Sequence, residues 1–437
     1  MHSGSTIYDA GVVGGGLAGL TAAAYLARCG RTVTVLERAE RPGGRAQTKE
    51  SKGFFYNQGP HAFYKGGEGS EILAELGIRY TAGMPNVAGS AIRNGRLFML
   101  PAGGRSLLTT RLFAMRDRVE AARLLLAFRK LAGEQPRGTS VSAWLAAESH
   151  QPAAQQYVEA VVRLSTYANA PETIEVTDAA RQFAGASSGV DYIDGGWVTL
   201  VNGLRRVVEE AGGTVEVAAR VAAVESTSAG HTIRLADGRA ISSKSIVLAV
   251  SPAAAAELLP GDATLASLSR SAVPARAACL DVSVSKLPSP RRTFALGIDT
   301  PIYYSVHSKV ARLAPGGMHT VSVAKYLHPE ADHDPAGTLA ELESALDLLQ
   351  PGWRELEVGR QYLPEMVVTT AISNVATGGL AGRPGPALAT SAGVFVAGDW
   401  VGNHRWLADA TLGSAREAAR LAEVYLGAPA PVLATVS

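Results

Sequence analysis

Three glycines near the start of the chain have the spacing of a phosphate-binding turn. Gly14, Gly16 and Gly19 form the pattern G-x-G-x-x-G between an apolar run, residues 7–13, and an alanine-rich run, residues 17–28. In this pattern the first glycine permits a tight turn, the second lets the backbone approach a pyrophosphate, and the third allows a helix to pack closely on a strand. Because the N-terminus of that helix favours negative charge, the motif predicts a dinucleotide site.

An acidic residue follows at the position where a ribose would bind. Residues 32–36 are β-branched and alternate, which predicts a second strand, and Glu37 comes directly after it, 18 positions beyond Gly19. A carboxylate here can accept hydrogen bonds from ribose hydroxyls. It also disfavours a 2′-phosphate and therefore NADP, so NAD and FAD both remain open. The alternative without a ligand is a glycine-rich turn beside a surface glutamate.

A second glycine cluster narrows the choice of dinucleotide. Gly43, Gly44 and Arg45 come shortly after the second strand, and a guanidinium beside two small residues suits a second contact with phosphate. With these residues, the segments VVGGGLAGL, TVTVLERAERPGGRAQT and FFYNQGPH resemble the N-terminus of the flavin-dependent superfamily of amine oxidases, protoporphyrinogen oxidases and phytoene desaturases. The resemblance is closest to phytoene desaturase-like flavoproteins, and it implies that the dinucleotide is FAD.

The same resemblance returns in two later segments. YIDGGWVTLVNGLRRVVEEAGGTVEVAARVAAV is similar to a glycine pair, a helix and a strand that meets the adenine, and VFVAGDWVG resembles a segment at the pyrophosphate and ribityl chain. The last helix of the relatives commonly opens M-E-G-A-V, whereas residues 408–412 read ADATL here, with alanine in place of the glycine. The FAD contacts that the resemblance implies are Gly14, Gly15, Gly16, Leu17, Ala18, Gly19, Glu37, Arg38, Gly43, Gly44, Arg45, Gly59, Pro60, His61, Val221, Gly398, Asp399, Thr411 and Leu412.

Few residues are candidates for catalysis or substrate binding. His61 is the catalytic candidate, because the resemblance puts its loop beside the isoalloxazine ring and a histidine can move a proton near neutral pH. The alternative is a histidine that only packs the loop. Four aromatic residues are expected to line the substrate cavity, with ordinary packing as the alternative for each. They are Tyr303, Tyr304, Trp400 and Trp406, and His404 lies in the same segment as the tryptophans.

The lysines bear on whether the substrate is an amine. Amine oxidases of the superfamily carry a lysine, linked to the flavin through water, on a strand of the substrate domain. The similar segment here, residues 275–285, has no lysine. Lys286 and Lys325 lie nearby and either could approach the flavin, although an ordinary exposed lysine is the alternative at both positions. The pattern weakens the amine oxidase interpretation.

Composition excludes several other classes of protein. The 437 residues carry a net charge of only +2, which disfavours nucleic acid as a partner. Cys29 and Cys279 are the only cysteines, so neither a disulfide framework nor a zinc site is indicated, and no metal is expected. Because neither a secretory signal nor a membrane-spanning run is found, we expect a cytoplasmic protein. The sequence does not specify an oligomeric state.

One basic segment raises the question of membrane contact. RLFAMRDRVEAARLLLAFRKL combines an apolar helix face with basic residues. Such a helix can lie on a membrane surface or cover the entrance for an apolar substrate. A packed surface helix is the alternative.

The elements that must position these residues predict an α/β protein. We expect a Rossmann-like FAD-binding domain of the GR2 type, a mixed-sheet substrate domain and a helical insertion. The FAD-binding domain is expected to be discontinuous, in residues 1–85, 190–261 and 385–430. Residues 86–189 are expected to form the helical insertion of the substrate domain, and residues 262–384 its mixed sheet.

These expectations combine into an FAD-dependent oxidoreductase that removes a hydride from a small, apolar organic substrate, as a phytoene desaturase-like enzyme does. The first alternative is a flavin amine oxidase acting on a C–N bond. The second is a non-catalytic escort resembling GDP-dissociation inhibitors, against which the intact glycines, Glu37 and Gly398-Asp399 argue. The sequence specifies neither the substrate nor the electron acceptor.

Overall fold

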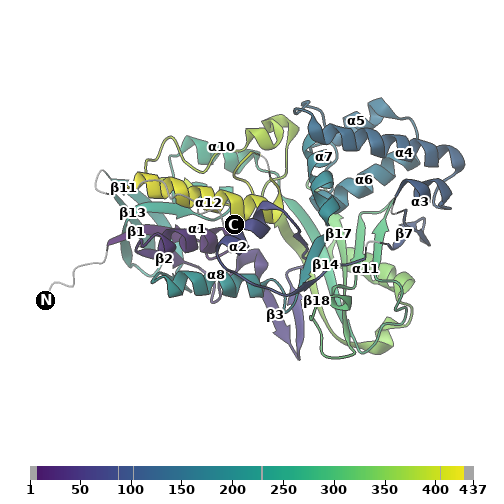
Figure 1. The fold of residues 1–437 in the computed structure, drawn as a ribbon, viewed down its shortest axis with the longest axis horizontal. Coiled ribbons are helices and arrows are strands. Elements are labelled where there is room, and N and C mark those ends of the chain that lie inside the picture. The colour runs from purple at the N-terminus through teal and green to yellow at the C-terminus, as the bar shows by residue number, and fades with distance from the viewer. Residues whose placement is uncertain (1–6, 87, 102, 228–229, 404, 428–437) are drawn as a thin grey trace.

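The first of two lobes contains a seven-stranded sheet. The structure is a computed structural model that describes residues 7–86, 88–101, 103–227, 230–403 and 405–427, and Figure 1 shows this sheet in the left-hand lobe. The strand order is β10-β2-β1-β13-β12-β11, and β19 pairs with β13. The strands are β1 (Ile7–Val13), β2 (Val33–Leu36), β10 (Thr214–Glu216), β11 (Val221–Thr227), β12 (Gly230–Leu235), β13 (Ala240–Leu248) and β19 (Val394–Val396).

The predicted strand-helix-strand unit lies at the centre of this sheet. β1 pairs in parallel with both β2 and β13, and α1 (Leu17–Arg28) makes the crossover from β1 to β2. Most of α1 is alanine and leucine and is buried, so it packs in one core with α8 (Val198–Glu210) and α12 (Leu407–Tyr425). Because β1, β2 and β13 are parallel, their carboxyl ends meet at one edge, where open α/β sheets bind ligands.

The second lobe contains another seven-stranded sheet, of order β18-β14-β17-β16-β15-β7-β8. It is mixed, since β15 and β7 are parallel while the other pairs are antiparallel. Alternate residues of β14 face two cores: Ala277 and Cys279 face a helical cluster, whereas Ala278 and Leu280 face α11 (Pro335–Leu349). The strands are β7 (Ser90–Arg93), β8 (Arg96–Met99), β14 (Ala275–Val284), β15 (Phe294–Gly297), β16 (Ile302–Ser305), β17 (His319–Leu327) and β18 (Glu357–Thr369).

Helices cover one face of the second sheet, at the upper right of Figure 1. They are α3 (Gly104–Thr109), α4 (Met115–Lys130), α5 (Val141–Glu148), α6 (Pro152–Thr166) and α7 (Val176–Gly185). The remaining helices are α2 (Glu68–Glu75), α9 (Pro252–Leu258) and α10 (Ala263–Ser271). Short strands complete the fold: β3 (Thr48–Ser51) with β4 (Phe54–Asn57), and β9 (Val190–Ile193) between β5 (Phe63–Tyr64) and β6 (Ala82–Gly83).

The predicted α/β class with mixed sheets is confirmed, but two expected segments differ in detail. Residues 86–189 are not only helical, because β7 and β8 at their start extend the second sheet. Residues 262–384 begin with α10, whose Leu265 packs in a core with strands of the first sheet rather than the second. In both places a short element packs on the sheet or core nearest to it in space. The hydrophobic pattern of the local sequence does not show which sheet or core that is.

Two expected absences can be compared with the structure. No helix in the described ranges is both long and apolar enough to cross a membrane. The same residues contain no cluster of His, Cys, Asp or Glu suited to a metal ion. Cys29 and Cys279 are both free thiols.

Candidate active site

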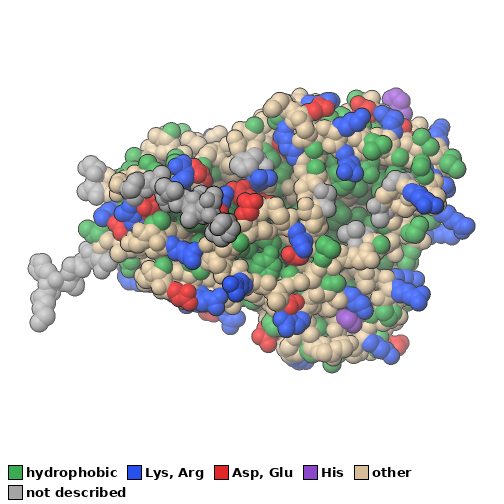
Figure 2. Space-filling view, viewed as in Figure 1, with side chains coloured by type: hydrophobic (Ala, Val, Ile, Leu, Met, Phe, Trp, Pro, Cys, Tyr) green, Lys and Arg blue, Asp and Glu red, His purple; other side chains and the backbone are tan. Residues whose placement is uncertain are grey.

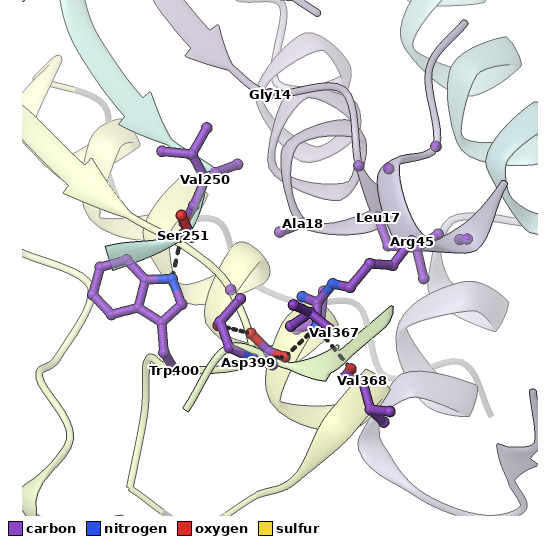
Figure 3. A pocket seen from close by; sticks show the side chains of 18 of the residues that line it. Gly14, Leu17, Ala18, Arg45, Val250, Ser251, Val367, Val368, Asp399 and Trp400 are labelled. Carbon is purple, nitrogen blue, oxygen red and sulfur yellow. Dashed lines mark hydrogen bonds and ion pairs between the residues drawn. The ribbon is translucent and has the colours of Figure 1, made fainter. Parts of the chain in front are cut away.

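A cavity of about 450 Å³ lies between the two lobes (Figure 3). Its first end is formed by the turn after β1, by residues 43–46 and by the segment after β19. Its second end is formed by β14, β17 and β18 of the second sheet, and the start of α12 also lines it. Segments that are far apart in the sequence therefore meet in one cavity, and the predicted site residues can be compared with its lining.

Most of the predicted cofactor contacts line this cavity. The lining includes Gly14, Gly16, Leu17, Ala18, Glu37, Arg38, Gly43, Gly44, Arg45, Pro60, His61, Val221, Gly398, Asp399 and Thr411. Four predicted contacts are not part of the lining. They are Gly15, Gly19, Gly59 and Leu412.

The glycine turn after β1 leaves space for a ligand at Gly16. A Cβ atom on Gly14 would lie 2.6 Å from the carbonyl oxygen of Ala249, and one on Gly19 would lie 1.8 Å from that of Gly14. At Gly16, in contrast, a Cβ would meet nothing closer than the carbonyl oxygen of Gly43 at 4.0 Å. Gly14 and Gly19 thus allow close packing, whereas Gly16 exposes its backbone to the cavity.

Glu37 is held in place by the same turn. One carboxylate oxygen accepts a hydrogen bond from the Gly15 amide at 2.7 Å, and the other accepts one from the Ala39 amide at 2.9 Å. Each oxygen keeps a further acceptor site, so Glu37 can still bind ribose hydroxyls. Gly15 was predicted to contact the cofactor, but its amide orients Glu37 instead.

Arg45 connects the two lobes across the cavity, as Figure 3 shows. Its Nη1 donates to the carboxylate of Asp399 at 2.6 Å and to the carbonyl oxygen of Val368, on β18, at 2.8 Å. Burial alone would raise the pKa of Asp399, but Arg45 and a hydrogen bond from Thr370 hold that pKa well below its usual value. The side chain of Arg45 remains 38% exposed, so it can also contact a phosphate.

Of the two residues at the start of α12 that are predicted to contact the cofactor, one lines the cavity and the other does not. Ala408 and Thr411 line the cavity, whereas Leu412 is fully buried in the core between α12 and the first sheet. Leu412 lies one turn beyond Ala408 on the same side of the helix, where α12 has already entered the core and no longer borders the cavity. Gly59 is covered by a lining residue, because a Cβ there would lie 2.3 Å from the sulfur of Met366.

His61 lines the cavity, but both of its ring nitrogens face backbone carbonyls. Nδ1 lies 2.8 Å from the carbonyl oxygen of Gly59, and Nε2 lies 3.1 Å from that of Arg45. The ring also stands edge-on to Trp197, with centroids 4.6 Å apart. Burial lowers the pKa of His61, which favours the neutral ring. The neutral ring has one N–H and donates to only one of the two carbonyl oxygens at a time, so it holds one loop by a hydrogen bond and packs against the other. This supports a positioning role more than proton transfer.

The second end of the cavity is apolar. Its lining from β14, β17, β18, the C-cap of α6 and the start of α12 consists of Ala277, Cys279, Ala324, Tyr326, Met366, Val367, Val368, Tyr167, Leu407, Ala408 and Thr411. None of these side chains carries a charge near neutral pH. Charged side chains of the lining, such as Glu37 and Arg45, belong to the first lobe.

Tyr326 brings one polar atom into this apolar end. Its side chain is only 3% exposed, and its hydroxyl has no hydrogen-bond partner in the described part of the chain. Tyr167 packs edge-on against it, with centroids 6.3 Å apart. Burial raises the pKa of Tyr326 far above its usual value, so the hydroxyl stays protonated. An unpaired buried hydroxyl is costly, and a bound substrate could provide its partner.

Three of the four aromatic residues predicted for the substrate do not line the cavity. Tyr304 lies on the far face of the second sheet, where its hydroxyl donates to the carbonyl oxygen of Arg292 at 2.8 Å. Tyr303 points into a cluster with Tyr192 and His307. Trp406 is buried in the helical core. Neighbouring residues of a strand point to opposite faces, so the pair Tyr303-Tyr304 could not both face a substrate.

Trp400 does line the cavity, but at its first end. Its indole nitrogen donates to the carbonyl oxygen of Val250 at 2.9 Å (Figure 3), beside the turns of the first sheet. It is therefore closer to the dinucleotide end than to the apolar one. His404 lies outside the described residues.

The two candidate lysines do not line the cavity. Lys325 lies on β17 between Ala324 and Tyr326, which do line it, and its Nζ pairs with Glu341 of α11 at 2.6 Å. Lys286 lies beyond the end of β14 and is exposed. Tyr326 is the main cavity residue that the sequence analysis does not predict. The alternation in HTVSVAKYL does indicate that Ala324 and Tyr326 lie on one face of the strand.

Comparison with curated proteins finds relatives over short stretches. Carotenoid 3,4-desaturase from Haloarcula japonica is 52% identical over 52 residues, which is 12% of this chain and 10% of that protein. L-amino-acid oxidase from Crotalus adamanteus is 53% identical over 49 residues, which is 11% of this chain and 10% of that protein. The matched stretches thus span about a tenth of the length of these relatives.

Similarity over the whole chain comes from a solved structure and from a family model. An oxidoreductase from Methanosarcina mazei superposes with a TM-score of 0.75 at 19% identity, covering 93% of this chain and 98% of that one, so the two share a fold. The model of the flavin-containing amine oxidoreductases matches residues 17–422. This match argues against the alternative of a non-catalytic escort protein. The chain belongs to the family of flavin-containing amine oxidoreductases and is an FAD-dependent enzyme.

Proposed function

We propose that the enzyme desaturates a neutral, largely apolar organic molecule by removing a hydride from one of its carbon atoms. The observation that supports this is the uncharged second end of the cavity, where β14, β17 and β18 contribute alanine, cysteine, methionine, valine and tyrosine side chains. A substrate with a formal charge would lose its hydration there without gaining a counter-charge, which is unfavourable. A neutral apolar molecule is stabilised by the same lining.

We propose that the first end of the cavity holds FAD. Gly16 and Gly44 would lie against the phosphates, because a Cβ atom at either position would meet nothing closer than 3.6 Å. Glu37 would accept hydrogen bonds from the ribose, and Val221 would lie beside the adenine. Arg45 would contact the pyrophosphate while it keeps its ion pair with Asp399.

The residues of this chain would position the substrate and exclude water. Bound FAD supplies the acceptor for the hydride. The apolar side chains Ala277, Ala324 and Met366 would hold the reacting carbon in a dry environment, which limits side reactions with water. His61, which lies between the carbonyl oxygens of Gly59 and Arg45 and donates to one of them, would help to keep the two adjoining loops in place. In desaturation the carbon next to the oxidised one gives up a proton to water, so a C=C bond forms and the hydride and the proton account for the two hydrogens lost.

Oxidation of a C–N bond is the second candidate. It is favoured by the short but strong similarity to the L-amino-acid oxidase. An amine would have to enter as the neutral base, because the second end of the cavity offers no carboxylate among its described lining residues.

The test is anaerobic reduction of the flavin in the purified holoenzyme, and the loss of flavin absorbance is measured. Isoprenoids, porphyrinogens, amines and amino acids are added separately, and oxygen is admitted afterwards. We expect bleaching with an isoprenoid and none with an amino acid or a porphyrinogen, because both of these carry charged carboxylates. Rapid bleaching by an amine, with none by the apolar compounds, would reverse the order of the two candidates. The rate of recovery with oxygen separates an oxidase from a dehydrogenase.

A further inference from the structure

Exposed apolar side chains are concentrated on one edge of the second lobe. Of the thirteen large apolar side chains that are exposed in the described residues, five fall within 28 residues of sequence. They are Met99, Leu108, Met115, Val119 and Leu126. Scattered single exposed apolar residues need no explanation, whereas a group of this kind marks a contact surface.

The helix α4 arranges three of these side chains in one stripe. At 100° per residue, Met115, Val119 and Leu126 lie within an arc of about 40° around the helix axis. They are 66%, 57% and 62% exposed. The other side of the helix is fully buried, through Leu124 and Phe128. The helix therefore has its own core contact and a second apolar face that the described chain leaves uncovered.

Basic residues surround this stripe. Residues 96–130 contain eight Lys or Arg and two Asp or Glu, a net charge of +6 in a chain whose total is +2. By helical position Arg129 and Lys130 flank the stripe on either side. Seven of the eight basic side chains form no ion pair within the part of the chain that the structure describes. They are Arg96, Arg105, Arg111, Arg116, Arg118, Arg129 and Lys130, and only Arg123 is paired.

We propose that α3, α4 and the turn between them dock on the surface of an anionic lipid bilayer. Apolar side chains in the stripe would enter the boundary between headgroups and acyl chains, while Arg129 and Lys130 would extend to the phosphates. Figure 2 shows green hydrophobic side chains beside blue Lys and Arg side chains at the right-hand end of the molecule, where Figure 1 places α3 and α4. Each basic residue near an anionic surface strengthens binding to that surface.

A second copy of the chain fits this surface less well. A two-fold dimer would bring the same patch of each subunit together, so two segments of net charge +6 would face each other. Like charges of this kind oppose association, whereas they favour an anionic bilayer. The surface also lies on the helices that cover the apolar end of the cavity. Docking would therefore bring the substrate lobe close to a source of apolar molecules.

The test is flotation of the FAD-loaded enzyme with vesicles. Vesicles of phosphatidylglycerol and phosphatidylcholine are compared with vesicles of phosphatidylcholine alone, at low and high salt. We expect binding to the anionic vesicles only, weakened by salt because screening shortens the reach of charge. The double variant Val119→Asp/Leu126→Asp should bind at least tenfold more weakly. The control is Val424→Asp, an apolar residue on α12 that is 49% exposed.

Flavin content and the thermal midpoint are measured for each variant, so that loss of fold is recognised. A second variant, Arg129→Gln/Lys130→Gln, removes charge without changing the apolar stripe and should lower the affinity for anionic vesicles several-fold. Three outcomes would overturn the proposal: no binding by the unmodified enzyme, equal binding by Val119→Asp/Leu126→Asp, or a dimer in light scattering that this variant dissociates while no vesicle binding is seen.

Discussion

Gly14, Gly16 and Gly19 belong to one motif but have three different surroundings. Gly14 has a φ of +104° and touches the carbonyl of Ala249, so both its conformation and its neighbours require glycine. Gly19 packs against the carbonyl of Gly14. Gly16 has an ordinary φ of −75° and free space beside it. Neither the backbone conformation nor the neighbouring protein atoms require a glycine at Gly16, so only the space for a ligand does.

Gly16→Val should separate cofactor binding from folding. The valine side chain would occupy the space beside the phosphates, while its backbone conformation is one that any residue adopts. We expect the ratio of flavin to protein to fall at least tenfold, with the circular dichroism of the FAD-free protein unchanged. Gly19→Ala should instead destabilise the fold itself. Gly185→Ala, where a Cβ meets nothing within 4 Å, is the control, and full flavin occupancy in Gly16→Val would contradict the assignment.

Tyr326→Phe tests whether the unpaired hydroxyl serves the substrate. Removing a buried hydroxyl without a partner should leave the unfolding free energy unchanged or raise it by up to about 1 kcal/mol. If the substrate carries a polar group that reaches Tyr326, its KM should rise about tenfold, as expected for the loss of one hydrogen bond. Denaturation and steady-state kinetics measure the two effects. An unchanged KM would mean that the hydroxyl makes no contact with the substrate, and Tyr304→Phe, on the far face of the sheet, is the matched control.

His307 should make stability depend on pH. Burial, with a smaller effect of His61, lowers the pKa of His307 to about 3. The unfolded chain therefore takes up a proton below pH 6.5 that the folded protein does not, so stability falls as the pH drops from 6.5 towards 3, by at most about 1.4 kcal/mol per pH unit. In His307→Gln this fall should be shallower, as measured by urea denaturation at several pH values. If stability depended on pH in the same way in His307→Gln and in the parent enzyme, His307 would not be the residue responsible. His150→Gln, at an exposed position, is the control.

At the scale of elements, the first lobe could be predicted and the lining of the second could not. The unit of β1, α1 and β2 has a clear change of period from strand to helix, and its glycine motif fixes which end binds the ligand. For β16 and β17 the sequence gives the alternation but not which face meets the cavity, because that depends on α11 and the helical cluster packing on opposite sides. The sequence therefore predicts Tyr303 and Tyr304 at the substrate, whereas in the structure Tyr326 lines the cavity.

Lys325→Met tests the orientation of β17. The Nζ of Lys325 pairs with Glu341 of α11, on the face of the sheet opposite to the cavity. Because the side chain is 22% exposed and its partner more so, we expect a loss of at most about 1 kcal/mol in stability. The rates of flavin reduction and of reoxidation by oxygen should stay within about twofold of the parent enzyme, as followed by stopped-flow absorbance. Reoxidation slowed tenfold or more would show that Lys325 acts near the flavin.

For the whole molecule, the cavity is also where the two lobes are joined. Arg45 of the first lobe holds Val368 of β18, and its partner Asp399 accepts a hydrogen bond from the Thr370 amide just beyond β18. Gly59 packs on Met366 of the same strand. A ligand that spans this cavity therefore contacts both lobes at their junction, and its binding energy contributes to holding them together.

Removal of FAD should accordingly weaken the whole enzyme and not one lobe only. A ligand at one hundred times its Kd stabilises the folded state by about 2.7 kcal/mol, so the FAD-free enzyme should unfold at a lower temperature and its midpoint should rise with added FAD. NAD is the control ligand and should give no comparable shift. Limited proteolysis of the FAD-free form should cut first in the segments that pass between the lobes, at residues 43–47 and 370–374, since the ligand no longer covers them. A midpoint that does not respond to FAD, with unchanged proteolysis, would show that the lobes are held together by the chain alone.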